Sequence, residues 1–472
     1  MKQKNKNFIY NVIYQIFVFL IPLITTPYIS RVLGVDNIGI YSYTYSIVYY
    51  FMLTALLGIN NYGSREIAKC YNNKEERSKK FLTIYTLQLS LTLIMTTMYI
   101  LFVNIYDYTY KTIMYIQTIY LVSVAFDINW FFFGLEKFKI TVTRNIIIKL
   151  LSFVLTLICV KTKDDLWIYT LIMSMSTLIS QLFLWIFLKK EIVFVRFKVK
   201  EVKEVIGHLK KCIVLFIPVI AYSIYRVMDK TMIGSMAGTV ELGNYENAEK
   251  IINVPISFVT ALGTVMLPYM SKNDKNFDNE MKETFELSFF LIIPMIIGLF
   301  SISNDLALIL FGKEFEKAGN IMIFLLPTIL FSSIATTIRM NYLIPSQKDS
   351  IYVKSTIYGA VINFVFNMIF IKKYGAYGAC IGTVIAEFTV AMYQILKTKN
   401  DIKYKTMLKL LGKYLIKGIL SVGCATIVGF FIKNLYIRVV IIIFISAILY
   451  VSMNYKYIYY EFLGKKENKR GE

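Results

Sequence analysis

Long apolar stretches recur along this chain, and they constrain its fold more than any other feature. Each covers roughly 18–25 residues, the length that a helix rising 1.5 Å per residue needs to cross a hydrocarbon core about 30 Å thick. Charged residues make up 17% of the sequence and hydrophobic residues 57%, whereas soluble proteins carry about a quarter charged residues. The sequence therefore predicts an all-α polytopic membrane protein.

Fourteen of these stretches are predicted to be transmembrane helices: 8–29, 38–60, 81–103, 112–133, 143–160, 166–188, 212–234, 247–270, 285–302, 320–344, 353–371, 374–396, 411–432 and 437–460. Because cytoplasmic loops carry an excess of Lys and Arg, the loop charges test this assignment. With the N-terminus inside, the cytoplasmic segments and their flanks hold 38 of the 52 Lys and Arg residues, and the external ones hold 10. Both termini are therefore expected to be cytoplasmic.

Two parts of the chain share a glycine pattern. GVDNIGIY (34–41) follows the first span, and GTVELGNY (238–245) follows the seventh, so each gives Gly-x4-Gly-x-Tyr after a helix that carries a proline. An offset of six spans preserves direction, so the repeats would be parallel, with a site expected between them. Chance similarity between apolar segments is the alternative. The similar DINW (127–130) and RMNY (339–342) also lie six spans apart.

The repeat and two basic connectors predict four regions. These are an N-terminal six-helix lobe (1–190), a basic cytoplasmic connector (191–211), a C-terminal six-helix lobe (212–397), and a basic linker with helices 13 and 14 and a cytoplasmic tail (398–472). No external loop exceeds roughly twenty residues, so no external catalytic domain is expected.

The stretch YRVMDKTMIG (225–234) places three charges inside a predicted span. An ionisable residue at the bilayer centre costs about 2.5–3.5 kcal/mol on insertion scales, so it usually faces a partner or a wet cavity. Arg226, Asp229 and Lys230 have helical spacing that puts them on one face, with Tyr222 one turn earlier. We interpret this face as a substrate-binding cavity wall. The alternative is a structural Arg226–Asp229 pair, with Lys230 extending to the outer interface.

Three further ionisable residues in predicted spans are candidates for the site. Glu387 follows a strip of small residues (Gly378, Gly382, Ala386) in span twelve, and it could bind a coupling proton or sodium ion or form a fixed pair with a cation. Asp127 and Arg339 lie in the inner halves of spans four and ten. They are candidates for an inner gate or the cytoplasmic mouth of the cavity, although Arg339 could also extend to the inner surface.

Several function classes find no support in the sequence. It holds no nucleotide-binding loop and no nucleophile–base pair, while five cysteines and one histidine suggest neither a disulfide framework nor a metal site. No cofactor is expected. The net charge of +22 lies mainly between spans, which favours contact with anionic lipid headgroups over nucleic acid. A stripe of lysines at 405, 409, 413 and 417 fits headgroup contact, or guidance of a lipid pyrophosphate to the cavity.

A set of motifs, in order from span one to span twelve, resembles the Wzx-type polysaccharide flippases. These belong to the PST branch of the MOP superfamily, which also holds the MATE exporters and the lipid II flippases. The motifs are PYISRVLGVDNIGIYSY (27–43), NYGSREIAK (61–69), DINWFFFGLEKFKIT (127–141), YRVMDKTMIGSMAG (225–238), GKEFEKAG (312–319), NYLIPSQKDS (341–350) and KYGAYGACIGTVIAE (373–387).

The resemblance implies two six-helix lobes in a MATE-like V arrangement plus two C-terminal helices. It also implies a flippase of the bacterial cytoplasmic membrane that moves undecaprenyl-pyrophosphate-linked oligosaccharide repeat units from the inner to the outer leaflet by alternating access. By position, Arg226 and Lys230 fall in the span-seven motif, and Glu387 falls in the span-twelve motif. Asp229 is a second candidate for the coupling ion. Membrane lipids, a polysaccharide polymerase and chain-length proteins are the candidate partners.

Three other functions remain open at this stage. A MATE-like cation or drug exporter would need an acidic cavity, whereas the predicted one is mixed to cationic. A multispanning polymerase or glycosyltransferase would usually need a large external loop or clustered external carboxylates. A scaffold in a polysaccharide assembly complex is the third alternative.

Overall fold

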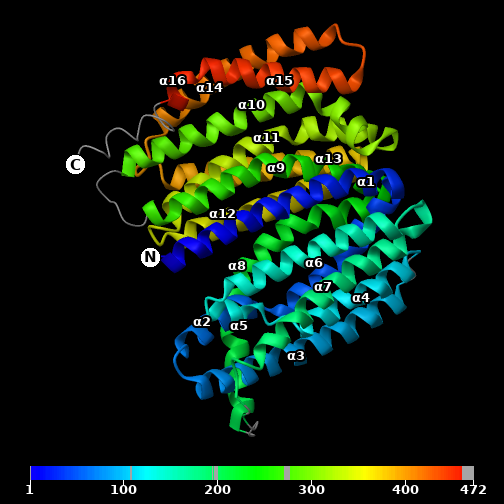
Figure 1. Ribbon diagram of the computed structural model, residues 1–472, viewed down its shortest axis with the longest axis vertical. Helices are drawn as coiled ribbons and strands as arrows, with labels where there is room; N and C mark the ends of the chain where they lie inside the picture. Colours follow the sequence, from blue (N-terminus) through cyan, green and yellow to red (C-terminus); the bar gives the residue numbers. More distant parts are fainter. Residues whose placement is uncertain (1, 107–108, 194, 196–199, 271–276, 460–472) are drawn as a thin grey trace. The chain divides into compact units, whose positions relative to one another are not determined.

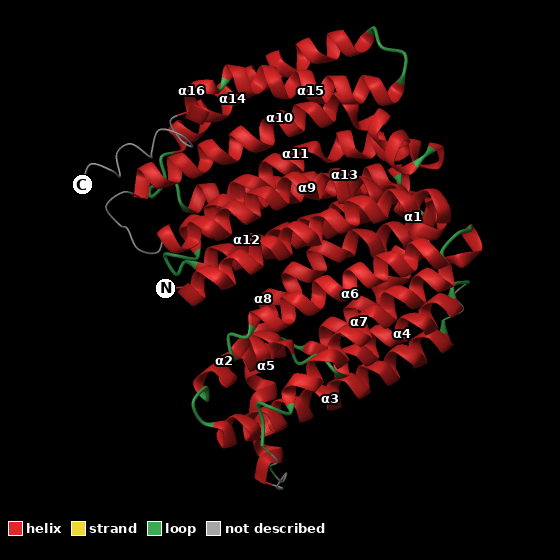
Figure 2. Cartoon of the chain, viewed as in Figure 1, coloured by secondary structure: helices red, strands yellow, loops and turns green. Residues whose placement is uncertain are grey.

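The computed structural model describes residues 2–106, 109–193, 195, 200–270 and 277–459, with some side chains in helices also left undescribed (Figure 1). Every regular element in these ranges is a helix, and none of these residues forms a strand (Figure 2). Eleven helical segments of the described chain are long and apolar enough to cross a membrane. The predicted all-α polytopic class is therefore confirmed.

The first compact unit is Met1–Glu246. It contains α1 (Lys2–Leu56), α2 (Ile59–Lys69), α3 (Lys74–Ile105), α4 (Lys111–Ala125), α5 (Asn129–Gly134), α6 (Phe138–Cys159), the 3-10 turn η1 (Lys163–Asp165), α7 (Leu166–Leu188), α8 (Lys200–Met236) and the first residues of α9 (Thr239–Met270).

The second compact unit is Asn247–Glu472. It contains the rest of α9, α10 (Phe277–Phe311), the 3-10 turn η3 (Lys313–Phe315), α11 (Glu316–Ile338), the π-helix η4 (Arg339–Leu343), α12 (Asp349–Tyr374), α13 (Ala376–Lys397), α14 (Tyr404–Phe430), α15 (Leu435–Met453) and α16 (Tyr455–Ile458). Helices α14 and α15 lie side by side and both pack on α10 (Figure 1).

Each predicted span overlaps at least one helix of the described chain, but the count of fourteen stays a prediction. The first of the eleven candidate segments, Ile24–Lys69, contains the second predicted span and the end of the first. Two helices that match predicted spans seven and eight, α8 and α9, are not among the eleven. The boundaries expected for the lobes and the connector likewise stay predictions.

The first glycine of each Gly-x4-Gly-x-Tyr motif lies at a break between helical segments. Gly34 interrupts α1 with φ 78°, and Gly238 separates α8 from α9 with φ 94°. Positive φ is unfavourable for residues that carry a Cβ, so glycine is the residue that makes such sharp reversals without strain. The repeated glycines therefore turn the chain at the end of one span and start the next.

Two of the sequence motifs in the first unit pack on one another. A Cβ added at Gly63 in α2 would lie 2.6 Å from the ring of Trp130 in α5, and one added at Gly134 would lie 2.7 Å from the carbonyl oxygen of Ser64. Trp130 is fully buried and donates its indole N–H to Gln88 Oε1 at 2.9 Å. NYGSREIAK and DINWFFFG thus form one hydrophobic core with α3.

Small residues bring α12 and α13 together in the second unit. A Cβ added at Gly378 would lie 2.4 Å from the carbonyl carbon of Phe370, and one added at Gly382 would lie 2.2 Å from Asn367 Oδ1. Ala386 is fully buried on the same strip. Such close backbone approach is what small residues spaced four apart provide between membrane helices. The predicted packing strip is confirmed.

Candidate functional site

The charges of YRVMDKTMIG lie near the C-terminal end of α8 and have different surroundings. Lys230 Nζ is 2.7 Å from Glu246 Oε2, at the start of α9. Ser42 of α1 donates a hydrogen bond to the same carboxylate oxygen at 2.7 Å. Both charged side chains are largely buried, with 22% of Lys230 and 13% of Glu246 exposed. Lys230 is therefore held in an ion pair inside the first unit.

The neighbouring acid is more deeply buried. Asp229 is 6% exposed and accepts a hydrogen bond from the hydroxyl of Tyr245 at 2.9 Å. Tyr245 is the final residue of the second Gly-x4-Gly-x-Tyr motif. Arg226, one turn earlier on α8, is exposed, whereas the side chain of Tyr222 lies outside the described residues. The cavity-wall assignment of these four residues stays a prediction.

The two glycine motifs pack against each other within the first unit. A Cβ added at Gly39 would lie 1.8 Å from the carbonyl oxygen of Thr239, and one added at Gly243 would lie 2.0 Å from the carbonyl oxygen of Val35. The hydroxyl of Thr239 also donates to Asp36 Oδ1. This reciprocal contact holds the start of α9, and so Glu246, beside the second half of α1.

A row of tyrosines next to this ion pair was missed by sequence reasoning. Tyr41, Tyr45 and Tyr49 follow one another at four-residue spacing on α1, and their rings contact in sequence. Two more tyrosines join the row: Tyr120 of α4, whose hydroxyl is 2.8 Å from that of Tyr41, and Tyr169 of α7. The four-residue spacing was the available signal, because it places residues on one helical face.

Asp127 forms a local turn between α4 and α5. It is 8% exposed, and its Oδ1 accepts from the backbone N–H of Asn129 at 3.0 Å and from Asn129 Nδ2 at 2.6 Å. Asn129 also donates to Gln181 Oε1 at 3.0 Å and accepts from Arg144 Nη2 at 3.0 Å. These contacts explain the DINW motif as a stabilised helix break. The role of Asp127 in a gate stays a prediction.

Arg339 begins the π-helix η4 in the second unit. Its guanidinium carbon lies 5.2 Å from the centre of the Tyr352 ring, which is a cation–π distance. Asp127 and Arg339 belong to different units, so the gate that they were expected to form together stays a prediction.

Glu387 lies half-buried on α13, directly after Ala386. Its carboxylate has no hydrogen bond or ion pair with any residue that the structure describes. Coupling-ion binding at Glu387 or Asp229 stays a prediction. Within the described ranges, no three His, Cys, Asp or Glu side chains are grouped to hold a metal ion.

The lysine stripe on α14 divides into two pairs. Lys413 pairs with Glu286 of α10 at 2.7 Å, and Lys417 donates to Asn454 Oδ1 at 2.8 Å. Lys405 and Lys409 are exposed. The last two lysines of the stripe therefore anchor α14 to its neighbours, whereas headgroup contact by the first two stays a prediction.

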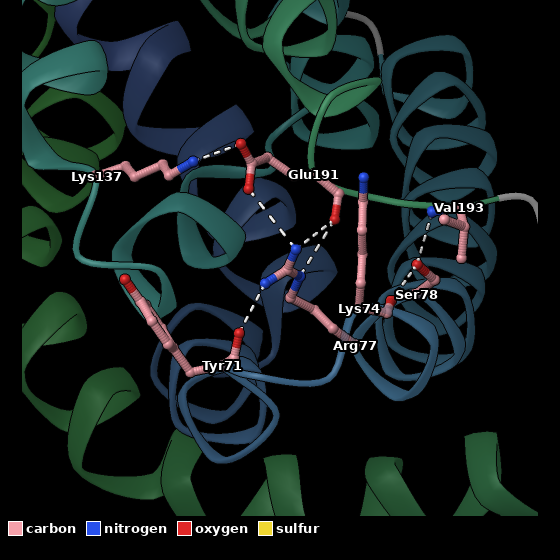
Figure 3. Close-up of polar contacts among 7 residues, drawn as sticks. All are labelled: Tyr71, Lys74, Arg77, Ser78, Lys137, Glu191 and Val193. Atoms are coloured by element: carbon pink, nitrogen blue, oxygen red, sulfur yellow. Dashed lines mark hydrogen bonds and ion pairs between the residues drawn. The ribbon is translucent and has the colours of Figure 1, made fainter.

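The basic connector is bound to the first unit at its start. Arg77 of α3 donates to the backbone carbonyl of Glu191 from Nη2 at 2.7 Å and to that of Tyr71 from Nη1 at 3.0 Å (Figure 3). The carboxylate of Glu191 accepts from Lys137 and lies 3.7 Å from the Arg77 guanidinium. Val193 donates its backbone N–H to Ser78 Oγ at 2.9 Å (Figure 3).

The same connector is bound at its end through the single histidine. His208 of α8 is 4% exposed and bonds through Nδ1 to the Tyr62 hydroxyl at 2.6 Å and through Nε2 to Thr83 Oγ1 at 3.0 Å. Burial lowers the pKa of His208 below its ordinary value. Because both ends of the connector contact other residues of the first unit, the described parts of the connector are packed against that unit.

These features define a class of protein. Eleven described helical segments are long and apolar enough to cross a membrane, and α8 and α9 bury an ion pair and a hydrogen-bonded carboxylate. Buried ionisable residues in a membrane protein commonly mark a substrate or ion pathway. The family described as polysaccharide biosynthesis protein matches residues 5–274, more than half of the chain. The chain belongs to this family.

Individual relatives agree with this assignment. A protein of Shigella dysenteriae named as an O-antigen transporter is 25% identical over 386 residues, which cover 81% of this chain and 96% of that protein. A lipid II flippase MurJ of Bacillus subtilis is 27% identical over 199 residues, covering 39% of this chain and 36% of the relative. The chain is therefore a membrane transporter of polysaccharide biosynthesis.

Solved structures confirm the fold. A lipid II flippase MurJ in an inward closed conformation matches with a TM-score of 0.77 at 17% identity, over 95% of this chain and 99% of that one. An inward-facing multidrug MATE transporter of the MOP superfamily matches with a TM-score of 0.59 at 12% identity, over 84% and 98% of the two chains. The predicted MATE-like fold is therefore confirmed.

Proposed function

We propose that this chain flips undecaprenyl-pyrophosphate-linked oligosaccharide repeat units from the inner to the outer leaflet of the bacterial cytoplasmic membrane by alternating access. The observation that carries the proposal is the pair of cations on α8, exposed Arg226 and ion-paired Lys230. A pyrophosphate diester brings two negative charges that lose water on entering the membrane, and fixed cations offset that loss. The relatives named as O-antigen transporters and glycan flippases support the same substrate class.

The ion pair also suits a substrate that must be released. A lone buried lysine would bind a diphosphate tightly, whereas Glu246 already neutralises much of the charge of Lys230 at 2.7 Å. Arg226 offers a planar donor group that can bind phosphate oxygens with two hydrogen bonds. In this proposal Arg226 holds the pyrophosphate, and Lys230 contributes when Glu246 is drawn away.

Deletion of the gene tests the proposal in cells. Lipid-linked repeat units should accumulate on the inner leaflet, and surface polysaccharide should be lost. Complementation with Arg226→Lys should restore more surface polysaccharide than Arg226→Ala at equal protein level, because lysine keeps the charge and loses the paired hydrogen bonds. Unchanged surface polysaccharide in a deletion strain without a second flippase would reject the function, and a fully active Arg226→Ala would reject the role of this residue.

A cation or drug exporter is the second candidate, and the MATE match favours it by fold. The described charges near the end of α8 include both signs, whereas an organic cation would be held best by uncompensated carboxylates. Vesicles that contain the purified protein discriminate the two functions. Uptake of an organic dye cation with no movement of the lipid-linked oligosaccharide would favour export.

Two further parts of the proposal concern coupling and partners. Glu387 or Asp229 binds a proton or a sodium ion that drives the return of the empty transporter. A polysaccharide polymerase and chain-length proteins receive the flipped unit at the outer leaflet. Co-purification of these proteins with the tagged chain from cross-linked membranes tests the second part.

A further inference from the structure

Three tyrosines on α1 form a continuous aromatic surface, here called the tyrosine row (Tyr41, Tyr45 and Tyr49). The ring centres of Tyr41 and Tyr45 are 6.0 Å apart, with 12° between the ring planes. Those of Tyr45 and Tyr49 are 6.2 Å apart, with an angle of 43°. At its outer end the row is fixed by the hydrogen bond between the Tyr41 and Tyr120 hydroxyls. The three tyrosine rings therefore form one continuous surface.

The tyrosine row differs from the surfaces that face lipid. The neighbouring helices expose large aliphatic side chains, for example Leu93 at 62%, Ile158 at 63% and Ile186 at 63%. Over residues 38–59, by contrast, no side chain is exposed to that extent, and all three tyrosines are half-buried. A half-open surface of phenol rings fits a polar, partly enclosed space better than contact with acyl chains.

Two of the three hydroxyls of the row have no hydrogen-bond partner among the described residues, whereas that of Tyr41 bonds to Tyr120. Tyr45 and Tyr49 form no hydrogen bond with any residue that the structure describes. Ser42, one turn before Tyr45, bonds to Glu246 at 2.7 Å, and Glu246 pairs with Lys230. The row thus combines aromatic faces, unoccupied hydroxyls and an adjacent ion pair.

A buried side-chain amide beside Tyr41 has an acceptor that is not used in a hydrogen bond. Gln117 of α4 is fully buried, and its Nε2 donates weakly to the Tyr41 carbonyl at 3.5 Å. Its Oε1 has no partner among the described residues. Buried polar atoms are nearly always satisfied in native proteins, so this unpaired acceptor indicates that water or a ligand hydroxyl reaches the region.

We propose that the tyrosine row binds the sugar rings of the transported lipid. A pyranose ring has an apolar face of C–H groups and a rim of hydroxyls, so it can stack on Tyr45 and Tyr49 while its rim bonds to phenol hydroxyls and to the Lys230–Glu246 pair. This inference rests on the proposed function, and it assigns the carbohydrate, rather than the pyrophosphate or the lipid tail, to these residues. The row belongs to the first unit alone.

Binding to two lipids that differ only in the sugar tests the proposal. The probes are undecaprenyl pyrophosphate and the lipid-linked oligosaccharide extracted from the deletion strain, each titrated against the purified full-length chain. Tyr49→Ala should weaken binding of the oligosaccharide lipid about tenfold, which corresponds to about 1.4 kcal/mol, because the variant removes the aromatic face on which the sugar stacks. The same variant should bind undecaprenyl pyrophosphate as the wild type does.

Two further variants separate stacking from folding. Tyr49→Phe keeps the ring, so it should retain most of the affinity for the oligosaccharide lipid. Tyr115→Ala is the matched control, because Tyr115 is a tyrosine of α4 that is 42% exposed and bonds to Asn104 at the molecular surface. It should bind both lipids like the wild type. The amount of folded protein in each sample is measured by size-exclusion chromatography, and binding is compared per mole of that folded protein.

The outcomes distinguish this inference from the function on which it rests. Equal weakening for both lipids, or no weakening for either, in Tyr49→Ala would overturn the assignment of the sugar to the tyrosine row while leaving the flippase function standing. A wild-type chain that binds neither lipid would reject the proposed function and this inference together.

Discussion

At the scale of single residues, two charged residues of the candidate site are held by specific partners, one through an ion pair and one through a hydrogen bond. Lys230 pairs with Glu246, and Asp229 accepts from Tyr245. A charged group buried without a partner is strongly destabilising, whereas a paired one is tolerated. The ion pair and the hydrogen bond therefore explain how α8 accommodates Lys230 and Asp229 in a largely buried environment.

Glu246→Gln should lower the thermal unfolding midpoint of the purified protein, because it leaves Lys230 partly buried without its counter-charge. We expect a loss of about 1–3 kcal/mol, the range for an unpaired buried polar group. The double variant Lys230→Met, Glu246→Leu should recover part of it. Glu75→Gln is the control, because its pair with Lys79 is exposed, and exposed pairs contribute little. A midpoint equal to that of the wild type would contradict the structural role of the pair.

The stability of the first unit should depend on pH through His208. Burial lowers its pKa, so the folded chain favours the neutral imidazole, while the unfolded chain takes up a proton below about pH 6.5. Stability should thus be constant above that pH and fall as the pH decreases through it. Glu66 and Glu204 favour the protonated form, and Lys80 and Lys211 oppose it. His208→Gln should show a smaller loss between pH 7.5 and 5.5, and an identical loss would contradict this account.

At the scale of elements, the two glycine motifs set how helices meet. Gly34 and Gly238 reverse the chain with positive φ, and Gly39 and Gly243 let each motif approach the backbone of the other. Since the sequence shows the motif twice, a repeat could be predicted. That the two copies contact each other depends on the positions of α1, α8 and α9 in space, which no local pattern contains.

Gly39→Ala should strongly destabilise the first unit. The added Cβ would lie 1.8 Å from the Thr239 carbonyl oxygen, so the backbone must move, and overpacking of this kind typically costs about 1–3 kcal/mol. The readout is the yield of monodisperse protein and its unfolding midpoint. Gly423→Ala in α14 is the matched control, because nothing lies within 4 Å of its added Cβ. It should be neutral or slightly stabilising.

At the scale of the whole molecule, the chain is a multi-pass membrane transporter with a MurJ-like and MATE-like fold. The distribution of Lys and Arg predicts that both of its termini are cytoplasmic. The proposed direction of transport follows from the charge of the substrate, since an inside-negative membrane potential favours outward movement of an anion by about 2.3 kcal/mol per charge per 100 mV.

Reporter fusions should show both termini in the cytoplasm. A periplasmic phosphatase fused after residue 162 or 433 should be active, because both loops are expected outside, whereas fusion after residue 190 or 399 should be inactive. A cytoplasmic reporter at the same four positions should give the inverse pattern. Activity of the phosphatase at all four positions would contradict the predicted orientation.

An imposed potential should change the rate of flipping. In vesicles that contain the purified chain, a potential negative on the cytoplasmic side should accelerate outward movement of the lipid-linked oligosaccharide, because the pyrophosphate is anionic. Valinomycin with a potassium gradient sets the potential, and the same vesicles without the gradient are the control. Equal rates in both would show that charge movement across the field does not limit transport.

The candidate site shows where sequence reasoning ends. Spacing placed Arg226, Asp229 and Lys230 on one face of a helix, yet their surroundings differ: the first is exposed, the second buried and the third ion-paired. Glu246 and the tyrosine row were missed. The sequence does contain an acid at the edge of a predicted span and tyrosines spaced by four. These features indicate a site only once the packing of the helices that carry them is known.

The sequence by itself determined the membrane class, the positions of the helices and the family. In lipid each spanning segment must satisfy its own backbone hydrogen bonds, so helix and span are local properties that hydropathy reports directly. The tertiary structure decided that Lys230 pairs with Glu246, that Asp127 stabilises a helix break, and that the tyrosines form one surface. These contacts join residues that different helices bring together, and the packing of those helices is fixed by many weak interactions at once rather than by any one stretch of the chain.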